Sequence, residues 1–288
     1  MNPFTNAHSA HLVILIFLLS VFSPQALPQE PEPRPTYQSL VRRALDLMAA
    51  DSLLAAEAVI RQALKAEPAA QGNVLLWGHL AQIAERTGRD SAALEAYDIA
   101  IGLAPQGLGL RINRASLFMK IGDDSRALAD YNDVLFEEPD HQEALFMRAS
   151  IYRRRRQLKD ARADFEHILR LTPTHEQALQ GLALVNNADR RPREAMEDIN
   201  AVVTLYPNHA AGYALRAGFE FERKMYEQAE KDYDRAIELE PDNPTFRLAR
   251  ARFFIDTRRK RLARQDVRAA ARLGASPADI STVAGLER

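Results

Sequence analysis

The chain contains no cysteine among its 288 residues. This absence excludes a disulfide framework, a thiolate metal site, a cysteine nucleophile and a lipid-modified N-terminal cysteine. The sequence also lacks an HExxH motif, a glycine-rich phosphate loop, a GxSxG motif and a paired catalytic carboxylate pattern. No residue is therefore a candidate for catalysis. We expect a protein that is not an enzyme and that has no metal site and no cofactor.

Long apolar runs are also scarce, and the one that stands out is Leu12–Phe22, which reads LVILIFLLSVF. A helix of this length spans about 16 Å, roughly half of a hydrocarbon core of about 30 Å. A small-residue cleavage point follows at Ala26. Residues 1–26 therefore predict a signal peptide or, as the alternative, an uncleaved N-terminal anchor. Residues 27–36 predict a proline-rich spacer.

This segment sets the expected location of the protein. A cleaved signal peptide predicts export to the periplasm or outer envelope of a Gram-negative bacterium, whereas a retained segment predicts an inner-membrane anchor. No other segment of the sequence is apolar enough to cross a membrane.

The formal net charge of −1 conceals an asymmetry between the two halves of the chain. Residues 1–141 carry 11 Lys and Arg against 17 Asp and Glu, whereas residues 142–288 carry 27 against 22. The sequence therefore predicts an acidic N-terminal half and a basic C-terminal half.

Prolines recur every 34 residues, at Pro105, Pro139, Pro173, Pro207 and Pro241, and Pro68 precedes them. This period divides the chain into repeats, with a three-residue insertion at 71–73. Seven repeats result, numbered here in chain order: 37–70, 74–107, 108–141, 142–175, 176–209, 210–243 and 244–277.

Two columns of alanine support this division without further adjustment. The eighth residue of every repeat is alanine, at 44, 81, 115, 149, 183, 217 and 251, and so is the twentieth, at 56, 93, 127, 161, 195, 229 and 263. Apolar residues on both sides of the central break recur at three- and four-residue steps, so each repeat predicts two amphipathic helices. Alanine at a fixed place on both helices indicates a close crossing, because two helices approach to about 8 Å only where the side chains are small.

The sequence resembles tetratricopeptide repeat proteins. The second repeat carries most of the family signature, as Trp77, Leu80, Ala81, Gly88, Ala93, Tyr97, Ala100 and Pro105. The resemblance implies an all-α fold, a right-handed superhelical solenoid of stacked antiparallel helix pairs whose first helices line a concave groove. Residues 278–288 predict a short C-terminal capping helix. The chain departs from the family pattern at Asn186 and Glu220, which replace a usual aromatic residue.

Charged columns recur with the same period. Arginine occupies the seventh place in four repeats, as Arg114, Arg148, Arg216 and Arg250, and aspartate occupies the twenty-third place in five, as Asp130, Asp164, Asp198, Asp232 and Asp266. We expect a ladder of partly buried ion pairs within or between repeats. His141, His175 and His209 share the period too, but equivalent atoms of successive repeats lie about 10 Å apart, too far for one zinc ion.

Two surfaces are candidates for partner binding. The first-helix faces that core packing leaves free predict a peptide-binding groove, formed by Ile112, Ser116, Met119, Phe146, Ser150, Gly218, Phe221, Leu248 and Ile255. The ends of the first helices in repeats 4–7 predict a basic ridge, formed by Arg153, Arg154, Arg155, Arg156, Arg190, Arg191, Arg223, Lys224, Arg258 and Arg259. The ridge is interpreted as a solvated edge that opposes the helix dipoles or, alternatively, as a site for an acidic protein or anionic surface.

The functional prediction follows from the repeat. We expect a non-enzymatic protein–protein interaction scaffold that binds a polypeptide in its concave groove. The alternative is a non-catalytic regulatory or assembly subunit of a cell-envelope complex, tethered by the uncleaved N-terminal segment. No nucleic-acid partner is expected, because no stacking aromatic residues alternate with the basic ones.

Overall fold

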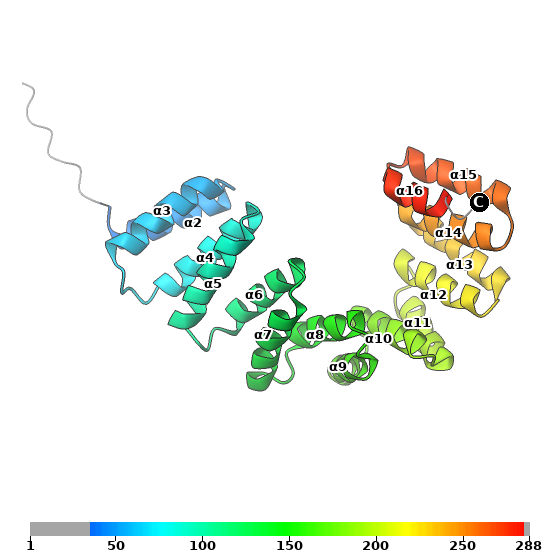
Figure 1. Ribbon diagram of the computed structural model, residues 1–288, viewed down its shortest axis with the longest axis horizontal. Helices are drawn as coiled ribbons and strands as arrows, with labels where there is room; N and C mark the ends of the chain where they lie inside the picture. The colour runs from blue at the N-terminus through cyan, green and yellow to red at the C-terminus, as the bar shows by residue number, and fades with distance from the viewer. Residues whose placement is uncertain (1–34, 285–288) are drawn as a thin grey trace, which may run out of the picture. The chain divides into compact units, whose positions relative to one another are not determined.

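A computed structural model describes residues 35–284 of the chain (Figure 1). The predictions for residues 1–26, and for the spacer up to residue 34, lie outside the described residues. The residues group into two compact bodies, one ending at Ala70 and the other beginning at Gln71. In the described part of the chain, no helix combines the length and apolar character that a membrane span requires.

Every regular element between residues 35 and 284 is an α-helix. The first body contains α2 (Tyr37–Ala49) and α3 (Leu53–Ala66). The second body contains the following helices in chain order: α4 (Asn73–Arg86), α5 (Asp90–Leu103), α6 (Leu108–Lys120), α7 (Asp124–Glu137), α8 (Gln142–Arg154), α9 (Leu158–Leu171), α10 (Glu176–Ala188), α11 (Pro192–Leu205), α12 (Ala210–Glu222), α13 (Tyr226–Leu239), α14 (Pro244–Asp256), α15 (Lys260–Arg272) and α16 (Pro277–Ala284).

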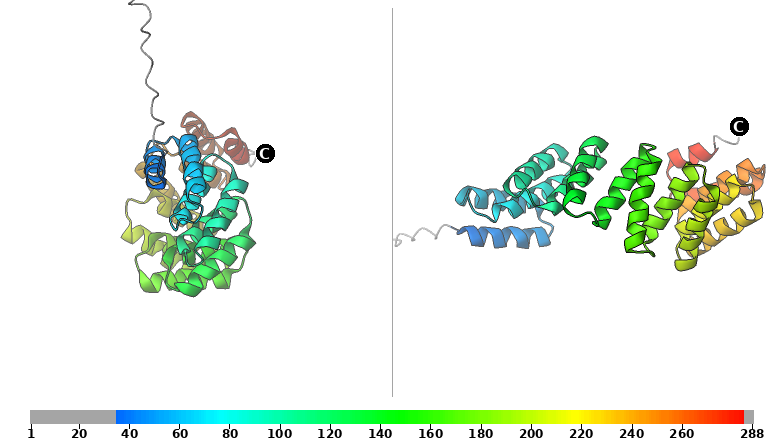
Figure 2. Two further views of the ribbon diagram at one scale, coloured as in Figure 1. Left: turned by 90° about the vertical axis from the view of Figure 1, so that its left-hand side faces the viewer. Right: turned by 90° about the horizontal axis from the view of Figure 1, so that it is seen from below.

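Each repeat corresponds to one pair of helices, from α2 and α3 in repeat 1 to α14 and α15 in repeat 7. In the second body, the second helix of each repeat also packs against the first helix of the next, so that successive pairs stack in order (Figure 2). The predicted all-α solenoid of stacked antiparallel helix pairs is confirmed. At its C-terminal end, α16 packs against α14 and α15 and buries Val283 beside the last repeat.

The two alanine columns lie at the centre of the helix pairs. All 14 of these alanines are buried, with at most 1% of each residue exposed. The large residue at the twenty-fourth place fills the neighbouring space, as Tyr97, Tyr131 and Phe165 do, each at most 1% exposed. Repeats 4 and 5 also approach closely, because a Cβ atom added to Gly181 on α10 would lie 2.4 Å from the ring of Phe165 on α9. Small residues at these places therefore set the distance between the helices.

The predicted arginine–aspartate ladder is present within repeats 3, 4, 6 and 7. In repeat 4, Nε and Nη2 of Arg148 donate to the two carboxylate oxygens of Asp164 at 2.9 and 2.8 Å. The aspartate is 8% exposed and the arginine 22%. The pKa of Arg148 is raised, first because of its hydrogen bonds to Asp164. Each pair therefore ties the two helices of one repeat with a bidentate, charge-assisted contact.

The same arginines also join successive repeats. The remaining Nη1 of Arg148 donates to Asn132 of repeat 3 at 2.8 Å, and that of Arg114 donates to Asp98 of repeat 2 at 2.6 Å. Arg216 and Arg250 reach the equivalent residue of the preceding repeat in the same way. One guanidinium group thus spans three helices at each of these repeats.

Repeat 5 lacks the ladder arginine and replaces it with an amide relay. Leu182 stands in the arginine's place, and Asp198 accepts instead from Nδ2 of Asn186 at 2.8 Å. The carbonyl oxygen of that amide accepts from Nε of Arg162, in repeat 4, at 3.0 Å. Because burial is only partly offset by one neutral donor, the pKa of Asp198 is raised. Asn186, which departs from the family pattern, therefore replaces the missing arginine as the donor to Asp198.

We expect Arg148→Met to lower the free energy of unfolding by about 1–3 kcal/mol, because it leaves the buried Asp164 without its charged donor. Asp164→Asn keeps one acceptor oxygen, so its loss should be smaller. Urea unfolding of both variants and of the double variant measures the coupling, with the exposed Arg153→Met as control. Stabilities equal to that of the unmodified chain for both single variants would contradict the ladder.

Candidate binding surfaces

Two of the nine predicted groove residues belong to the core. Ile112 is 7% exposed and Ile255 is 8% exposed. Ile112 lies in the cluster built around Tyr131 and Phe165, and Ile255 lies in the one that contains Phe253. The reason is the close stacking of repeats, because a neighbouring helix covers the face on which each isoleucine lies. Both residues are thus corrected from groove positions to core positions.

The other seven are half-buried on α6, α8, α12 and α14: Ser116, Met119, Phe146, Ser150, Gly218, Phe221 and Leu248. Packing against neighbouring residues buries part of the surface of each residue. Phe146 meets the ring of Phe165 edge-on at 5.9 Å, and Phe221 meets that of Phe253 at 5.6 Å. Each of these side chains therefore has one part in the core and one part accessible to a partner.

Gly218 on α12 has open space beside it. A Cβ atom added there meets no atom within 4 Å. A side chain introduced at this place would occupy the groove face without disturbing the packing of α12. The position therefore offers a direct probe of groove binding.

The basic ridge separates into paired and unpaired cations. Arg154 binds Asp124 of the preceding repeat, Arg155 donates to Ser125, Arg191 lies 3.6 Å from Glu194, Arg223 donates to Asn187 and to the backbone of Pro192, and Arg259 binds Glu230. All of these contacts except that of Arg191 join successive repeats, so four of the ten ridge residues contribute to stacking. The side chains of the other members, Arg153, Arg156, Arg190, Lys224 and Arg258, form no hydrogen bond or ion pair with any described residue.

Four of the unpaired cations share one unusual backbone conformation. Arg156, Arg190, Lys224 and Arg258 have φ values of 62°, 58°, 62° and 62°. They occupy the fifteenth place of their repeats, where repeats 2 and 3 have Gly88 and Gly122, also at positive φ. In the sequence these four belong to the basic ridge together with their neighbours. The signal that separates them was the alignment with the two glycines.

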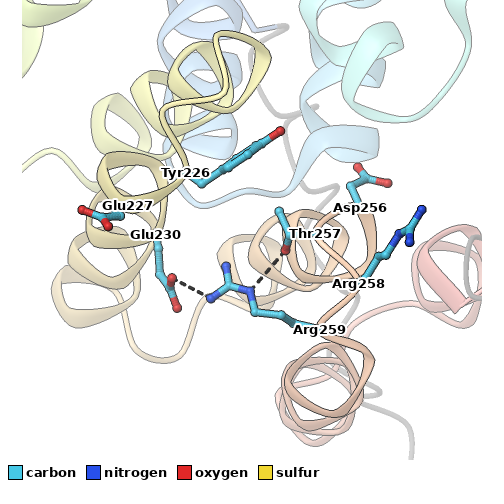
Figure 3. Close-up of a pocket in the computed structure, with 7 residues that line it drawn as sticks. All are labelled: Tyr226, Glu227, Glu230, Asp256, Thr257, Arg258 and Arg259. Carbon is cyan, nitrogen blue, oxygen red and sulfur yellow. Dashed lines mark hydrogen bonds and ion pairs between the residues drawn. The ribbon is translucent and has the colours of Figure 1, made fainter.

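Figure 3 shows a pocket of about 410 Å³ that is lined by residues of repeats 6 and 7. Arg259 crosses it, donating to Glu230 at 2.7 Å and to Thr257 at 3.2 Å, whereas Arg258 points away from that pair. Both acidic and basic side chains line the pocket, so it does not select an ion of one sign.

The periodic histidines have a structural role in two of three repeats. Nδ1 of His141 accepts from the backbone N–H of Ala144 at 3.3 Å, and His175 does the same for Ala178 at 3.2 Å. Both therefore cap the N-terminus of a first helix. Among residues 35–284, no group of three or more His, Cys, Asp or Glu side chains is placed to hold a metal ion.

Glu220 is a buried carboxyl group at the place where repeats 3, 4 and 7 have aromatic rings, and it is 6% exposed. Burial, and after it the nearby Asp232, raises the pKa of Glu220 from 4.5 to about 7. The cation that would stabilise the charged form of Glu220 is distant, because Nε of Arg216 lies 4.0 Å from Oε1 of Glu220. Oε2 of Glu220 has no hydrogen-bond partner. The group therefore changes charge near neutral pH inside the helix pair.

This shift makes stability depend on pH in a defined direction. The folded state retains the Glu220 proton up to about pH 7, whereas the unfolded state releases it near pH 4.5, so the stabilisation is complete below pH 4.5 and is lost as the pH rises to 7. We expect Glu220→Gln to remove this dependence and to be more stable than the unmodified chain by about 2 kcal/mol at pH 8. Urea unfolding at pH 5 and pH 8, with the exposed Glu227→Gln as control, measures the difference. Parallel pH curves for Glu220→Gln and the unmodified chain would contradict it.

Comparisons with known proteins agree with this architecture. The tetratricopeptide repeat family matches residues 41–107, 112–176 and 220–280, more than half of the chain. A tetratricopeptide repeat protein from Parabacteroides merdae is 26% identical, with 87% of this chain and 98% of that chain covered and a TM-score of 0.75. The C-terminal part of a repeat protein from Cytophaga hutchinsonii is 18% identical, with 83% and 98% covered and a TM-score of 0.62.

A larger assembly shares the fold as well. One chain in the structure of the APC/C hetero-tetramer Cut9–Hcn1 is 14% identical, with 87% of this chain and 55% of that chain covered and a TM-score of 0.59. No curated protein matches the chain. Proteins built from this repeat are generally non-enzymatic protein–protein interaction scaffolds. The chain belongs to the tetratricopeptide repeat family.

Proposed function

We propose that this protein is an interaction scaffold that binds a polypeptide partner along the first helices α6, α8, α12 and α14. The observation that carries the proposal is a set of half-buried apolar side chains, Met119, Phe146, Phe221 and Leu248, on one face of four repeats. An apolar helix or extended segment laid on such a face gains free energy by burying these side chains.

The arrangement of these apolar residues favours a polypeptide partner over a small molecule. The accessible apolar residues lie on four separate helices and alternate with the small Ser116, Ser150 and Gly218. A small-molecule site concentrates its contacts in one enclosed cavity, whereas a chain of repeats offers a long, shallow surface. The Cut9–Hcn1 assembly supports the same use of the fold, since there a repeat protein is joined to a second chain.

We also propose that the scaffold acts outside the cytoplasm. The support is the apolar run Leu12–Phe22 with the cleavage point at Ala26. If the segment is retained, the scaffold is a tethered assembly or regulatory subunit of an envelope complex. N-terminal sequencing of the protein from an envelope fraction separates these forms, because an exported protein begins after Ala26 and a tethered one keeps residues 1–26.

Groove binding is tested by two glycine substitutions. Both glycines lie within helices and have room for an added side chain. Gly218→Leu fills the groove face of α12, whereas Gly102→Leu adds the same side chain to α5, a second helix, where a Cβ atom also meets nothing within 4 Å. In a pull-down from the native envelope fraction, we expect Gly218→Leu to lower recovery of the partner about tenfold, because the leucine occupies the partner's place. Gly102→Leu should recover as much partner as the unmodified chain.

A second bait carries Met119→Ser, Phe146→Ser and Phe221→Ser, which remove apolar contact area instead of blocking the groove. All baits must first show equal helicity by circular dichroism. Loss of the same partner from the Gly218→Leu bait and the triple variant supports the groove. Equal recovery of the partner by Gly218→Leu, Gly102→Leu and the unmodified chain would contradict it.

A further inference from the structure

We propose that Arg156, Arg190, Lys224 and Arg258 form a row that binds an extended acidic segment of a protein partner. These four residues, called here the cation row, belong to repeats 4, 5, 6 and 7 and follow the first helix of each repeat. The proposal rests on the proposed function only in taking the partner to be a polypeptide. The row lies at the helix–helix turns and shares no residue with the groove.

The backbone of the row is unfavourable for the residues that occupy it. In each of these turns the N–H of the fifteenth residue donates to the carbonyl three residues earlier, and the next N–H donates five residues back, as Arg156 does to Arg153 and Gln157 to Tyr152. This hydrogen-bond pattern requires a left-handed residue, and glycine is the usual one because it has no Cβ atom. Gly88 and Gly122 fill the same place in repeats 2 and 3.

A cation at all four places therefore runs against local backbone preference. Residues held at positive φ with a long side chain are strained, and such strain concentrates where a function requires the side chain. Asp51 takes this conformation in repeat 1, but aspartate tolerates it better than arginine or lysine. The strain thus indicates that repeats 4–7 need four cations at this edge.

The charge of the row is not neutralised from within the protein. Carboxylates lie near these turns in sequence, but none of them forms an ion pair with the row: Asp189 beside Arg190 binds Arg162, and Glu222 near Lys224 accepts from Asn187. Asp256 and Arg258 line the same pocket, and no ion pair joins them. All four cations of the row are exposed, and none of their side chains forms a hydrogen bond or ion pair with a described residue. The row consequently presents four free positive charges to an acidic partner.

The spacing of the row fits an extended polypeptide. First helices of neighbouring repeats contact each other directly, as α8 with α10 and α12 with α14 do, so successive turns lie about 10 Å apart. An extended or polyproline-type chain rises about 3.1–3.3 Å per residue. A carboxylate at every third residue therefore meets one cation per repeat, over a segment of about 12 residues.

Other polyanions fit less well. Among residues 35–284, Tyr226 is the one well-exposed aromatic residue near the row, whereas single-stranded nucleic acid is bound by a series of stacking rings. A flat membrane contacts only part of a row that turns with the superhelix, because each repeat is rotated relative to the last. A flexible acidic segment can follow all four turns.

The test replaces all four cations with the residue that the backbone prefers. The row variant carries Arg156→Gly, Arg190→Gly, Lys224→Gly and Arg258→Gly in the full chain. The control carries Arg170→Ala, Arg193→Ala, Lys231→Ala and Arg268→Ala, which removes four exposed cations from the second helices of the same four repeats. The probes are a 12-residue peptide of four Glu-Ala-Pro triplets and an isomer in which the four glutamates are adjacent.

We expect the spaced peptide to bind the full chain and the row variant to bind it about 10- to 100-fold more weakly, with the control variant close to the unmodified chain. The row variant should also be more stable, with a Tm higher by about 5 °C, because glycine relieves the left-handed strain. Weaker binding together with a higher Tm excludes a row that only stabilises helix ends.

Three results would overturn the proposal. They are equal binding of the peptide by the row variant, an equal loss in the control variant, or row-dependent binding of duplex DNA or phosphatidylglycerol vesicles without binding of the peptide. Gly218→Leu separates this proposal from groove binding. That variant should keep its affinity for the acidic peptide even if it loses the groove partner.

Discussion

Close approach of two helices at paired alanines is the constraint on which the rest of this structure depends. Every repeat places one alanine on each helix at the crossing, and all 14 are buried. Because the crossing is so tight, the residue at the twenty-fourth place and the next repeat have a fixed space to fill. A side chain larger than alanine there would separate the helices and shift each repeat that follows.

The polar contacts occupy places that this packing creates. The ladder arginines lie where three helices meet, and each joins its own repeat to the one before. Where repeat 5 has Leu182 instead, the Asn186 amide takes over the bonding of Asp198. Glu220 has no equivalent compensation, which leaves a carboxyl group that titrates near neutral pH in the middle of repeat 6. Local departures from the repeat thus produce local electrostatic differences while the fold is retained.

The 34-residue period allowed most of the fold to be predicted from the sequence. Alanine, proline and the ladder residues recur at fixed places because each performs the same physical task in each repeat, and the structure confirms the helix pairs and the ion pairs. Individual groove residues were harder to assign. Whether Ile112 or Met119 is accessible depends on how far the neighbouring helix covers it, and one sequence without an alignment does not record that coverage.

The cation row shows a different limit of sequence reasoning. Arginine after a helix is ordinary as a pattern, and in the sequence Arg156 differs from Arg155 beside it only by its alignment with Gly88 and Gly122, whereas in the structure its φ of 62° sets it apart. Backbone strain is invisible until the turn geometry is known. The resulting picture is of a scaffold in which packing residues recur in every repeat, while the proposed binding residues lie on the surfaces that packing leaves free.

The alanine crossing is most directly tested by comparing two neighbouring residues of α5. Ala93 is fully buried at the crossing, and Ala92 beside it is exposed. Urea unfolding should show Ala93→Leu to be destabilised by about 2–3 kcal/mol, because the added methylene groups have no space, and Ala92→Leu to be nearly unchanged. Equal stabilities of the two variants would contradict the account, since they would show that the helices do not need a small residue where they cross.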